Sequence, residues 1–154
     1  MQIYLLRHAD AAEQGPGQSD AERPLTDRGI KQTAEVVAWM TGHRVRAEYV
    51  VASPRLRAMQ TAEPVADGLG VPMLTDYRLD GGRLTAQAVV DLVDELGSPE
   101  TVVLVGHEPD LSGLVEELTG GHVQMRKSSV AAIWCERIRA GRCTLTLLVP
   151  PRGT

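Results

Sequence analysis

The sequence lacks the features that would take a chain to a membrane or to a nucleic acid. Its 154 residues contain no apolar run near the roughly 20 residues that span a bilayer. The N-terminus has no basic region followed by a long apolar segment, so no signal peptide is indicated. The formal net charge is -4, which argues against a nucleic-acid groove or an anionic membrane surface as partner. We therefore expect a cytoplasmic protein with no nucleic-acid and no membrane partner.

Cysteine is scarce as well, since the chain has only Cys135 and Cys143. These two flank a predicted hairpin turn at Ala140–Gly141. A two-residue turn would put them on opposite faces of the hairpin, and a three-residue turn would leave them roughly 13 Å apart, too far for a disulfide. We expect two buried free thiols in a reducing compartment. No cysteine–histidine spacing suggests a zinc site.

The residues that are present predict one α/β domain over 1–154. Hydrophobic residues make up 43% and charged residues 23%, with no internal repeat and no domain boundary. Apolar patterns predict strands over 2–6, 49–53, 71–74, 101–106, 129–137 and 143–149, and helices over 27–41, 54–69, 85–96 and 109–118. We expect a three-layer α/β/α sandwich with a mostly parallel six-stranded sheet and an antiparallel edge hairpin. Pro64 is expected to kink or break its helix, and residues 9–24 to form a long mobile loop.

Arginine and histidine follow three of the predicted strands. Arg7 and His8 come after the first strand, Arg55 and Arg57 after the second, and His107 after the fourth. In open α/β sheets, ligands bind beyond the carboxyl ends of the strands. Three strands of the same polarity would therefore deliver these side chains to one edge, as a pocket for an anion.

Helix geometry distinguishes the two arginines after the second strand. With Pro54 as the first helical residue, Arg57 lies four residues after Ser53, on the face that looks toward the strand ends. Arg55 lies about 200° further around the helix. We expect Arg57 to enter the pocket and Arg55 to be a solvated or salt-bridging residue. The helix N-termini at Pro54 and Pro109 should add backbone N–H groups.

Two guanidinium groups and two imidazoles suit a doubly charged phosphoryl group. Histidine is a nucleophile for phosphorus when one ring nitrogen stays unprotonated, and a bond from the other nitrogen to a backbone carbonyl would fix that tautomer. We expect His8 to accept the phosphoryl group and His107 to stabilise its charge in the transition state. His43 and His122 are expected to be surface residues.

Four segments of the chain resemble the motifs of one family, and they occur in the family order. They are LLRHADA (5–11), PLTDRGIKQ (24–32), SPRLRAMQTA (53–62) and VLVGHEPDL (103–111). Together they resemble the histidine phosphatase superfamily, also called the phosphoglycerate mutase-like family. The resemblance implies that His8 becomes phosphorylated and that Arg7, Arg57 and His107 complete the phosphate pocket. It implies no metal and no organic cofactor.

The compact length points to one branch of that family. Larger members insert a segment after the third strand that carries an acidic general acid, where this chain has only TDYRLDGGRLTA (75–86). The chain looks most like the SixA-type phosphohistidine phosphatases, which implies a phosphorylated histidine phosphotransfer protein as substrate. An imidazole leaves with a conjugate-acid pKa near 6.5, so it needs a strong general acid far less than an alkoxide does.

Other functions stay open at this point. A small-molecule phosphomonoesterase of the same superfamily, acting on a small phosphorylated substrate, would need Asp10, Asp80 or Glu108 as general acid. Each of these residues also has a structural interpretation. Asp80 is expected in the turn before Gly81, and Asp10 at the rim of the pocket. Glu108 is expected to cap a helix, with its backbone N–H in contact with phosphate. A phosphate-binding module without catalysis is a third hypothesis. A mutase is a weaker hypothesis, because no substrate-covering insertion is present.

Overall fold

A six-stranded mixed sheet forms the centre of the computed structural model, which describes residues 1–151. The strands are β1 (Gln2–Arg7), β2 (Tyr49–Ala52), β3 (Met73–Thr75), β4 (Thr101–Gly106), β5 (Val130–Trp134) and β6 (Thr144–Val149), in the order β3-β2-β4-β1-β5-β6. The first four are parallel, β5 runs antiparallel to β1, and β6 runs antiparallel to β5. The predicted sheet with its antiparallel edge hairpin is confirmed.

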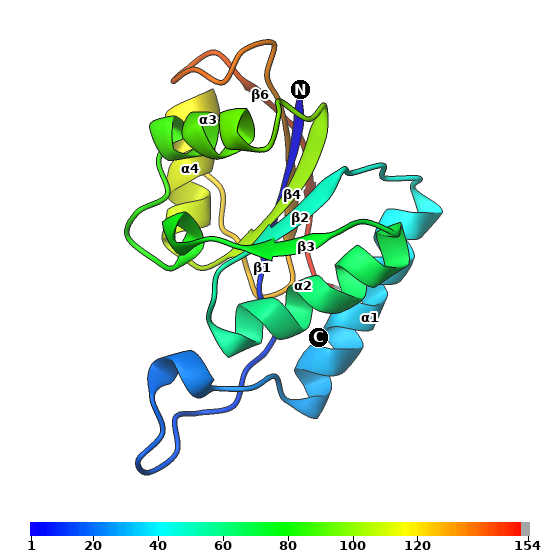
Figure 1. The fold of residues 1–154 in the computed structure, drawn as a ribbon, viewed down its shortest axis with the longest axis vertical. Helices are drawn as coiled ribbons and strands as arrows, with labels where there is room; N and C mark the ends of the chain where they lie inside the picture. The colour runs from blue at the N-terminus through cyan, green and yellow to red at the C-terminus, as the bar shows by residue number, and fades with distance from the viewer. Residues whose placement is uncertain (152–154) are drawn as a thin grey trace.

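Helices cover both faces of this sheet (Figure 1). Helices α1 (Asp27–Gly42) and α2 (Leu56–Leu69) pack on one face, and α3 (Ala86–Glu95) and α4 (Asp110–Thr119) pack on the other. Side chains alternate between the two cores, so Val102 and Leu104 of β4 face α3 and α4 whereas Val103 and Val105 face α1 and α2. This explains why the strand is apolar without interruption. None of the helices described has the length and apolar character of a membrane span.

Helix α2 starts later than predicted and passes through its proline. Pro54 and Arg55 form a bend, in which the Arg55 N–H donates to Ser53 Oγ at 3.2 Å, and the helix begins at Leu56. The helix continues past Pro64 to Leu69, so the expected break is wrong. Buried residues lie on both sides of the proline, and packing against the sheet outweighs the hydrogen bond that proline removes.

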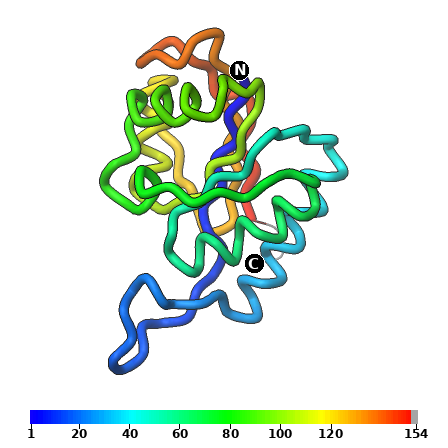
Figure 2. Tube along the Cα trace, in the orientation of Figure 1, coloured from blue at the N-terminus to red at the C-terminus, as the bar shows by residue number. Residues whose placement is uncertain are grey.

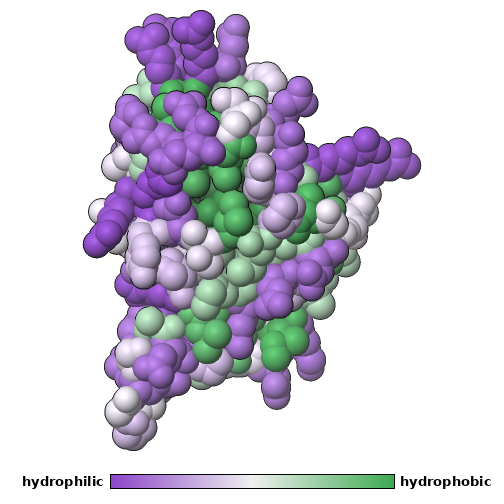
Figure 3. All heavy atoms as spheres, viewed as in Figure 1, coloured by the Kyte–Doolittle hydropathy of each residue, from purple (hydrophilic) through white to green (hydrophobic). Residues whose placement is uncertain are grey.

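The predicted loop after β1 contains its own short structure. Ala11 and Leu25 form an isolated antiparallel bridge, and Asp20–Glu22 form a 3-10 turn, η1. The Arg23 Nε–H donates to the Ala12 carbonyl at 2.7 Å and ties the two sides of the loop together. The loop projects beyond the carboxyl end of β1, at the lower end of the molecule in Figures 1 and 2, and its surface there is hydrophilic to neutral (Figure 3).

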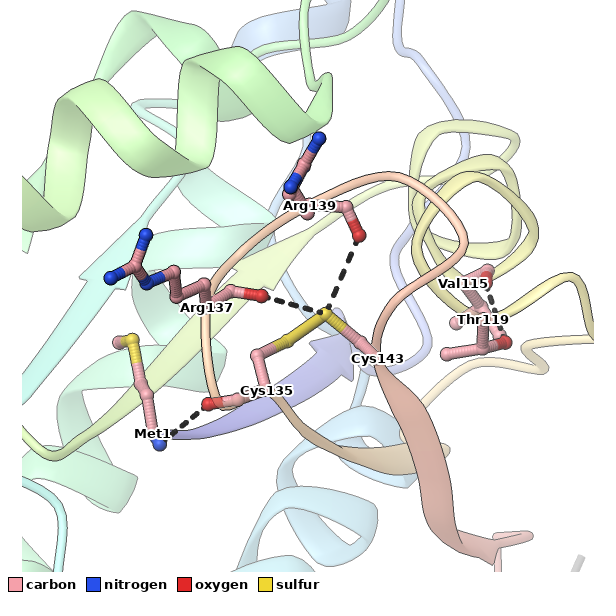
Figure 4. Close-up of a disulfide and its surroundings, with 7 residues drawn as sticks. All are labelled: Met1, Val115, Thr119, Cys135, Arg137, Arg139 and Cys143. Atoms are coloured by element: carbon pink, nitrogen blue, oxygen red, sulfur yellow. Dashed lines mark hydrogen bonds between the residues drawn. A yellow bond between two sulfur atoms is a disulfide. The ribbon is translucent and has the colours of Figure 1, made fainter.

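The edge hairpin holds a disulfide between Cys135 and Cys143, whose Cα atoms lie 4.6 Å apart (Figure 4). The prediction of two free thiols is therefore wrong. It assumed a tight turn at 140–141, whereas β5 already ends at Trp134 and β6 starts at Thr144. Trp134 pairs directly with Thr144, so the next residue on each side is a cysteine, and the two face each other across a wide loop.

Replacing both cysteines by serine should lower the free energy of unfolding by about 2–3 kcal/mol, because the bond closes a loop between residues eight apart in sequence. Urea denaturation of the oxidised wild type and the double variant would measure the difference. The wild type in reducing agent is the control and should match the variant. Equal denaturation midpoints in all three samples would contradict the disulfide.

Candidate active site

The strand register brings two histidines together at one edge of the sheet. Arg7 at the end of β1 pairs with Gly106 at the end of β4, so the residue after each is a histidine. The His8 N–H donates to the Gly106 carbonyl at 3.1 Å, and the ring centroids of His8 and His107 lie 5.1 Å apart. Strand β2 adds Ser53 beside them, since the Ser53 N–H donates to the Val105 carbonyl at 3.0 Å. The adjacent arginine and histidine of the first motif thus belong to a shared pocket.

The ring of His8 is held with Nε2 unprotonated. Its Nδ1 lies 2.8 Å from the Ala9 carbonyl, which only accepts, so Nδ1 carries the proton. The Ala9 N–H in turn donates to Thr61 Oγ1 at 3.0 Å, which fixes this peptide against α2. The ring is 6% exposed, and burial, together with the charges of His107, Arg57 and Arg7, lowers the pKa of His8 to about 3. His8 is therefore a neutral imidazole with a lone pair at Nε2.

His107 is held at its other nitrogen. Its Nε2 lies 2.8 Å from Ser53 Oγ, and the Ser53 hydroxyl also reaches Asp80 Oδ1 at 3.4 Å. Burial, then the positive charges of Arg57 and Arg55, lower the pKa of His107 to about 4. Because Ser53 holds Nε2 in either tautomer, Nδ1 is the atom left for a ligand.

Two arginines complete the cluster. Arg57 is 5% exposed, and its Nη1 and Nη2 donate to the Asp20 carbonyl and carboxylate at 2.9 and 3.0 Å. Arg7 is half-buried and donates from Nη1 to the Met125 carbonyl at 2.9 Å. The charge of each guanidinium contributes to the lowered pKa of His8.

Three nitrogens in this cluster have no hydrogen-bond partner. They are Arg7 Nε, Arg57 Nε and His107 Nδ1, and they are the only buried side-chain polar atoms without a partner in residues 1–151. Buried polar atoms are nearly always paired. Three unpaired nitrogens in one cluster, two of them on cations, indicate a site for an anion with several acceptor oxygens.

Arg55 is the salt-bridging residue that helix geometry predicts. Its side chain is 31% exposed, and its Nε and Nη1 donate to Asp80 and Asp20 at 2.9 and 2.5 Å. It therefore joins the loop after β1 to the short turn η2 (Tyr77–Leu79) that precedes Asp80. His43 and His122 are exposed, as predicted.

Asp20 was not among the residues predicted from sequence. It contacts Arg57 and Arg55, and the hydrogen bond from Arg23, followed by those charges, lowers its pKa to about 2. The serine and glutamate of Ser19–Glu22 form a capping box, a pattern that predicts a helical turn here. That pattern does not indicate which arginine the turn would reach. Ser53 and Thr61 were also missed as supports of the two histidines, although both lie in the SPRLRAMQTA motif.

The three candidate acids all act as acceptors. Asp10 accepts from Thr26 Oγ1 at 2.7 Å and from Lys127 Nζ at 2.9 Å, and these bonds lower its pKa. Glu108 accepts the Ser112 N–H at 2.8 Å and so caps α4, and Asp80 accepts from Arg55. These contacts weigh against a proton-donor role for the three carboxyl groups. Within residues 1–151, no three acidic, histidine or cysteine side chains are placed to hold a metal ion.

Neither buried histidine should titrate between pH 5 and 8, because burial lowers the pKa of His8 to about 3 and that of His107 to about 4. NMR signals of the ring protons would measure this, with the urea-unfolded chain as control, where histidine titrates near 6.5. The unfolded state binds more protons below that pH. The free energy of unfolding should therefore have its full value above pH 6.5 and decrease as the pH falls toward 4. The decrease should be up to about 1.4 kcal/mol per pH unit for each histidine. A folded-state midpoint near 6.5 for His8 would contradict the buried neutral ring.

Comparison with known proteins agrees with this geometry. The family model of the histidine phosphatase superfamily (branch 1) matches residues 3–81 of the sequence. The phosphohistidine phosphatase SixA of Escherichia coli is 33% identical over 139 residues, which cover 86% of this chain and 84% of that protein. A solved structure of the protein histidine phosphatase SixA complexed with tungstate has a TM-score of 0.82 at 30% identity, over 98% of this chain and 97% of that one. A phosphoserine phosphatase mutant from Entamoeba histolytica shares the fold, with a TM-score of 0.72 at 17% identity over 96% of both chains.

Proposed function

Because this chain belongs to the histidine phosphatase superfamily, we propose that it hydrolyses phosphohistidine on a phosphotransfer protein through a phosphorylated His8. The observation that carries the proposal is the set of three unpartnered buried nitrogens beside a histidine whose Nε2 bears a lone pair. The proposed catalytic residues are His8, His107, Arg7 and Arg57.

In the first step, His8 Nε2 attacks phosphorus as the bond from phosphorus to the substrate imidazole breaks. Arg7 and Arg57 neutralise the phosphoryl oxygens through guanidinium N–H groups. His107 contributes through Nδ1: when the Ser53 hydroxyl donates to Nε2, the neutral ring carries its proton on Nδ1 and donates it in a hydrogen bond to a phosphoryl oxygen as charge develops there. The Nδ1–H of His8 keeps its bond to the Ala9 carbonyl, which stabilises the positive charge that the ring acquires on phosphorylation.

In the second step, water attacks the phosphorus on His8. The bond from phosphorus to Nε2 breaks, inorganic phosphate leaves, and His8 returns to its neutral form. The water proton goes to the departing phosphate or to solvent. In the first step the substrate ring carries a proton on its other nitrogen and leaves as neutral imidazole, so it needs no strong acid, since the conjugate acid of that imidazole has a pKa near 6.5.

Substrate preference tests this proposal directly. We expect purified protein to dephosphorylate a histidine phosphotransfer domain much faster than a generic aryl phosphate at equal concentration. The readout is loss of phosphohistidine by native gel or mass spectrometry. Rapid ester hydrolysis with an untouched phosphorylated domain would reject the proposal in favour of a small-molecule phosphomonoesterase.

The phosphomonoesterase alternative makes its own prediction. It needs a general acid, so Asp10→Asn, Asp80→Asn or Glu108→Gln should cut ester turnover about 100-fold. Our account expects each amide variant to keep phosphohistidine turnover within about tenfold of wild type, since an imidazole leaving group needs little acid assistance. Initial rates of the three variants on both substrates would decide between them. A 100-fold loss on phosphohistidine in any one variant would contradict our account.

A further inference from the structure

A cationic cleft adjoins the phosphate pocket and shares Arg7 with it, but its other cations have no part in the chemistry described above. It has a volume of about 390 Å³. Its charged lining consists of four cations and one carboxylate: Arg7, Arg28, Arg126, Lys127 and Asp10. The whole chain carries a net charge of -4, so this local excess of positive charge runs against the overall balance.

The fold builds this cleft from segments far apart in sequence. The segment before β5 lies along the end of β1, because the Ser128 N–H contacts the Arg7 and His8 carbonyls at 3.1 and 3.2 Å. The same segment receives the Arg7 guanidinium at the Met125 carbonyl. Arg126 and Lys127 are therefore held next to a guanidinium of the phosphate pocket. Arg28 comes from the first turn of α1 and lines the same cleft.

The single carboxylate of the cleft is already engaged. Asp10 accepts from Lys127 Nζ at 2.9 Å and from Thr26 Oγ1 at 2.7 Å. The charge of Arg28 also lowers the pKa of Asp10, but the Arg28 guanidinium makes no ion pair with any residue of the described chain, and neither does Arg126. Both side chains are exposed. The cleft therefore offers two uncompensated guanidinium groups beside the one that Arg7 shares with the phosphate pocket.

We propose that this cleft binds carboxylate groups of the substrate protein that lie beside its phosphohistidine. The inference rests on the proposed function and adds a specificity site to it. Guanidinium groups bind carboxylates in a planar fork, and charges at the rim of an interface mainly raise the association rate. Arg28 and Arg126 thus select substrates whose phosphorylated histidine sits in an acidic surface. A small phosphorylated molecule without a second anion would not use them.

The test compares two double variants of equal charge change. Arg28→Ala with Arg126→Ala removes the cleft cations. Arg137→Ala with Arg142→Ala removes two exposed arginines of the β5–β6 loop, at the opposite end of the sheet. For each variant, kcat/KM is measured on three substrates. The first is a phosphorylated histidine phosphotransfer domain with carboxylates around its histidine, and the second is the same domain with those carboxylates changed to amides. The third is an aryl phosphate.

We expect the cleft variant to lose about tenfold or more in kcat/KM on the acidic domain. The fold loss in kcat/KM on the aryl phosphate should be at least about fivefold smaller. The loss should shrink at 200 mM salt relative to 50 mM salt. It should also shrink on the amide form of the domain. The control variant should match wild type on all three substrates.

Three outcomes would overturn the inference. In the first, the cleft variant equals the control on the acidic domain. In the second, it loses as much on aryl phosphate as on the domain, which would place its action on the phosphoryl group itself. The inference would also be overturned if the cleft variant showed the full loss in kcat/KM on the amide form of the domain. Failure of the proposed function is distinguishable, because wild type itself would then leave the phosphorylated domain unchanged.

Discussion

Replacing His8 by alanine is expected to reduce hydrolysis of phosphohistidine by at least about 10⁴-fold, as loss of a covalent nucleophile does in other enzymes. The reason is geometric. His8 has its Nδ1 proton committed to the Ala9 carbonyl at 2.8 Å, and its Nε2 lies in the cluster of unpartnered nitrogens. Single-turnover kinetics on a phosphorylated phosphotransfer domain would measure the loss.

The control for this variant is His122→Ala, because His122 is exposed. It should keep the wild-type rate. Because His8 is buried, circular dichroism and a urea midpoint should establish that the alanine variant is folded. A folded variant that keeps more than about a hundredth of the wild-type rate would contradict a covalent His8 intermediate. If the protein were a phosphate-binding module without catalysis, the wild type itself would not hydrolyse phosphohistidine. The wild-type rate therefore tests that alternative.

Removing Arg57 is expected to cost about 10²–10³-fold in kcat/KM, the effect of losing one preorganised donor to developing charge. Arg57 is 5% exposed, its Nε is buried without a partner, and its charge acts on both His8 and His107. Arg57→Ala also leaves the Asp20 carboxylate without its buried partner, so the loop after β1 loses a contact. Steady-state kinetics on the phosphorylated domain would measure the change.

Arg55→Ala provides the matched control, two residues away with the same change in charge. The Arg55 side chain is 31% exposed and its donors are engaged by Asp20 and Asp80, so we expect a loss within about tenfold. Arg57→Lys should remain well below wild type, because lysine keeps the charge but not the planar fork. If Arg55→Ala proved as damaging as Arg57→Ala, the assignment of Arg57 to the phosphate pocket would be wrong.

The sequence predicts the edge of the sheet and the cluster on it because strand polarity is a strong constraint. Once strands 2–6 and 101–106 are parallel neighbours, Arg7, His8 and His107 must emerge at the same end. Helical spacing then separates Arg57 from Arg55, even though the helix starts two residues later than expected. Both inferences depend on backbone periodicity, which the sequence shows directly.

The parts that the sequence does not predict depend on contacts between distant segments. Asp20 reaches Arg57 across 37 positions, and nothing in its own segment indicates that partner. The disulfide depends on where two strands stop, and strand ends are the least certain feature of a β pattern. Pro64 was expected to kink or break α2 from its local effect alone, but the helix runs through it without a break, with buried residues on both sides.

The central claim is that the phosphoryl group passes to His8, and rapid-quench label transfer tests it most directly. A phosphotransfer domain carrying radioactive phosphohistidine would be mixed with excess enzyme, quenched in alkali to preserve bonds between nitrogen and phosphorus, and digested for mass spectrometry. Our account predicts transient label on the peptide that contains His8, and none in the His8→Ala variant. Release of labelled phosphate at full rate with no label on His8 at any time would contradict it.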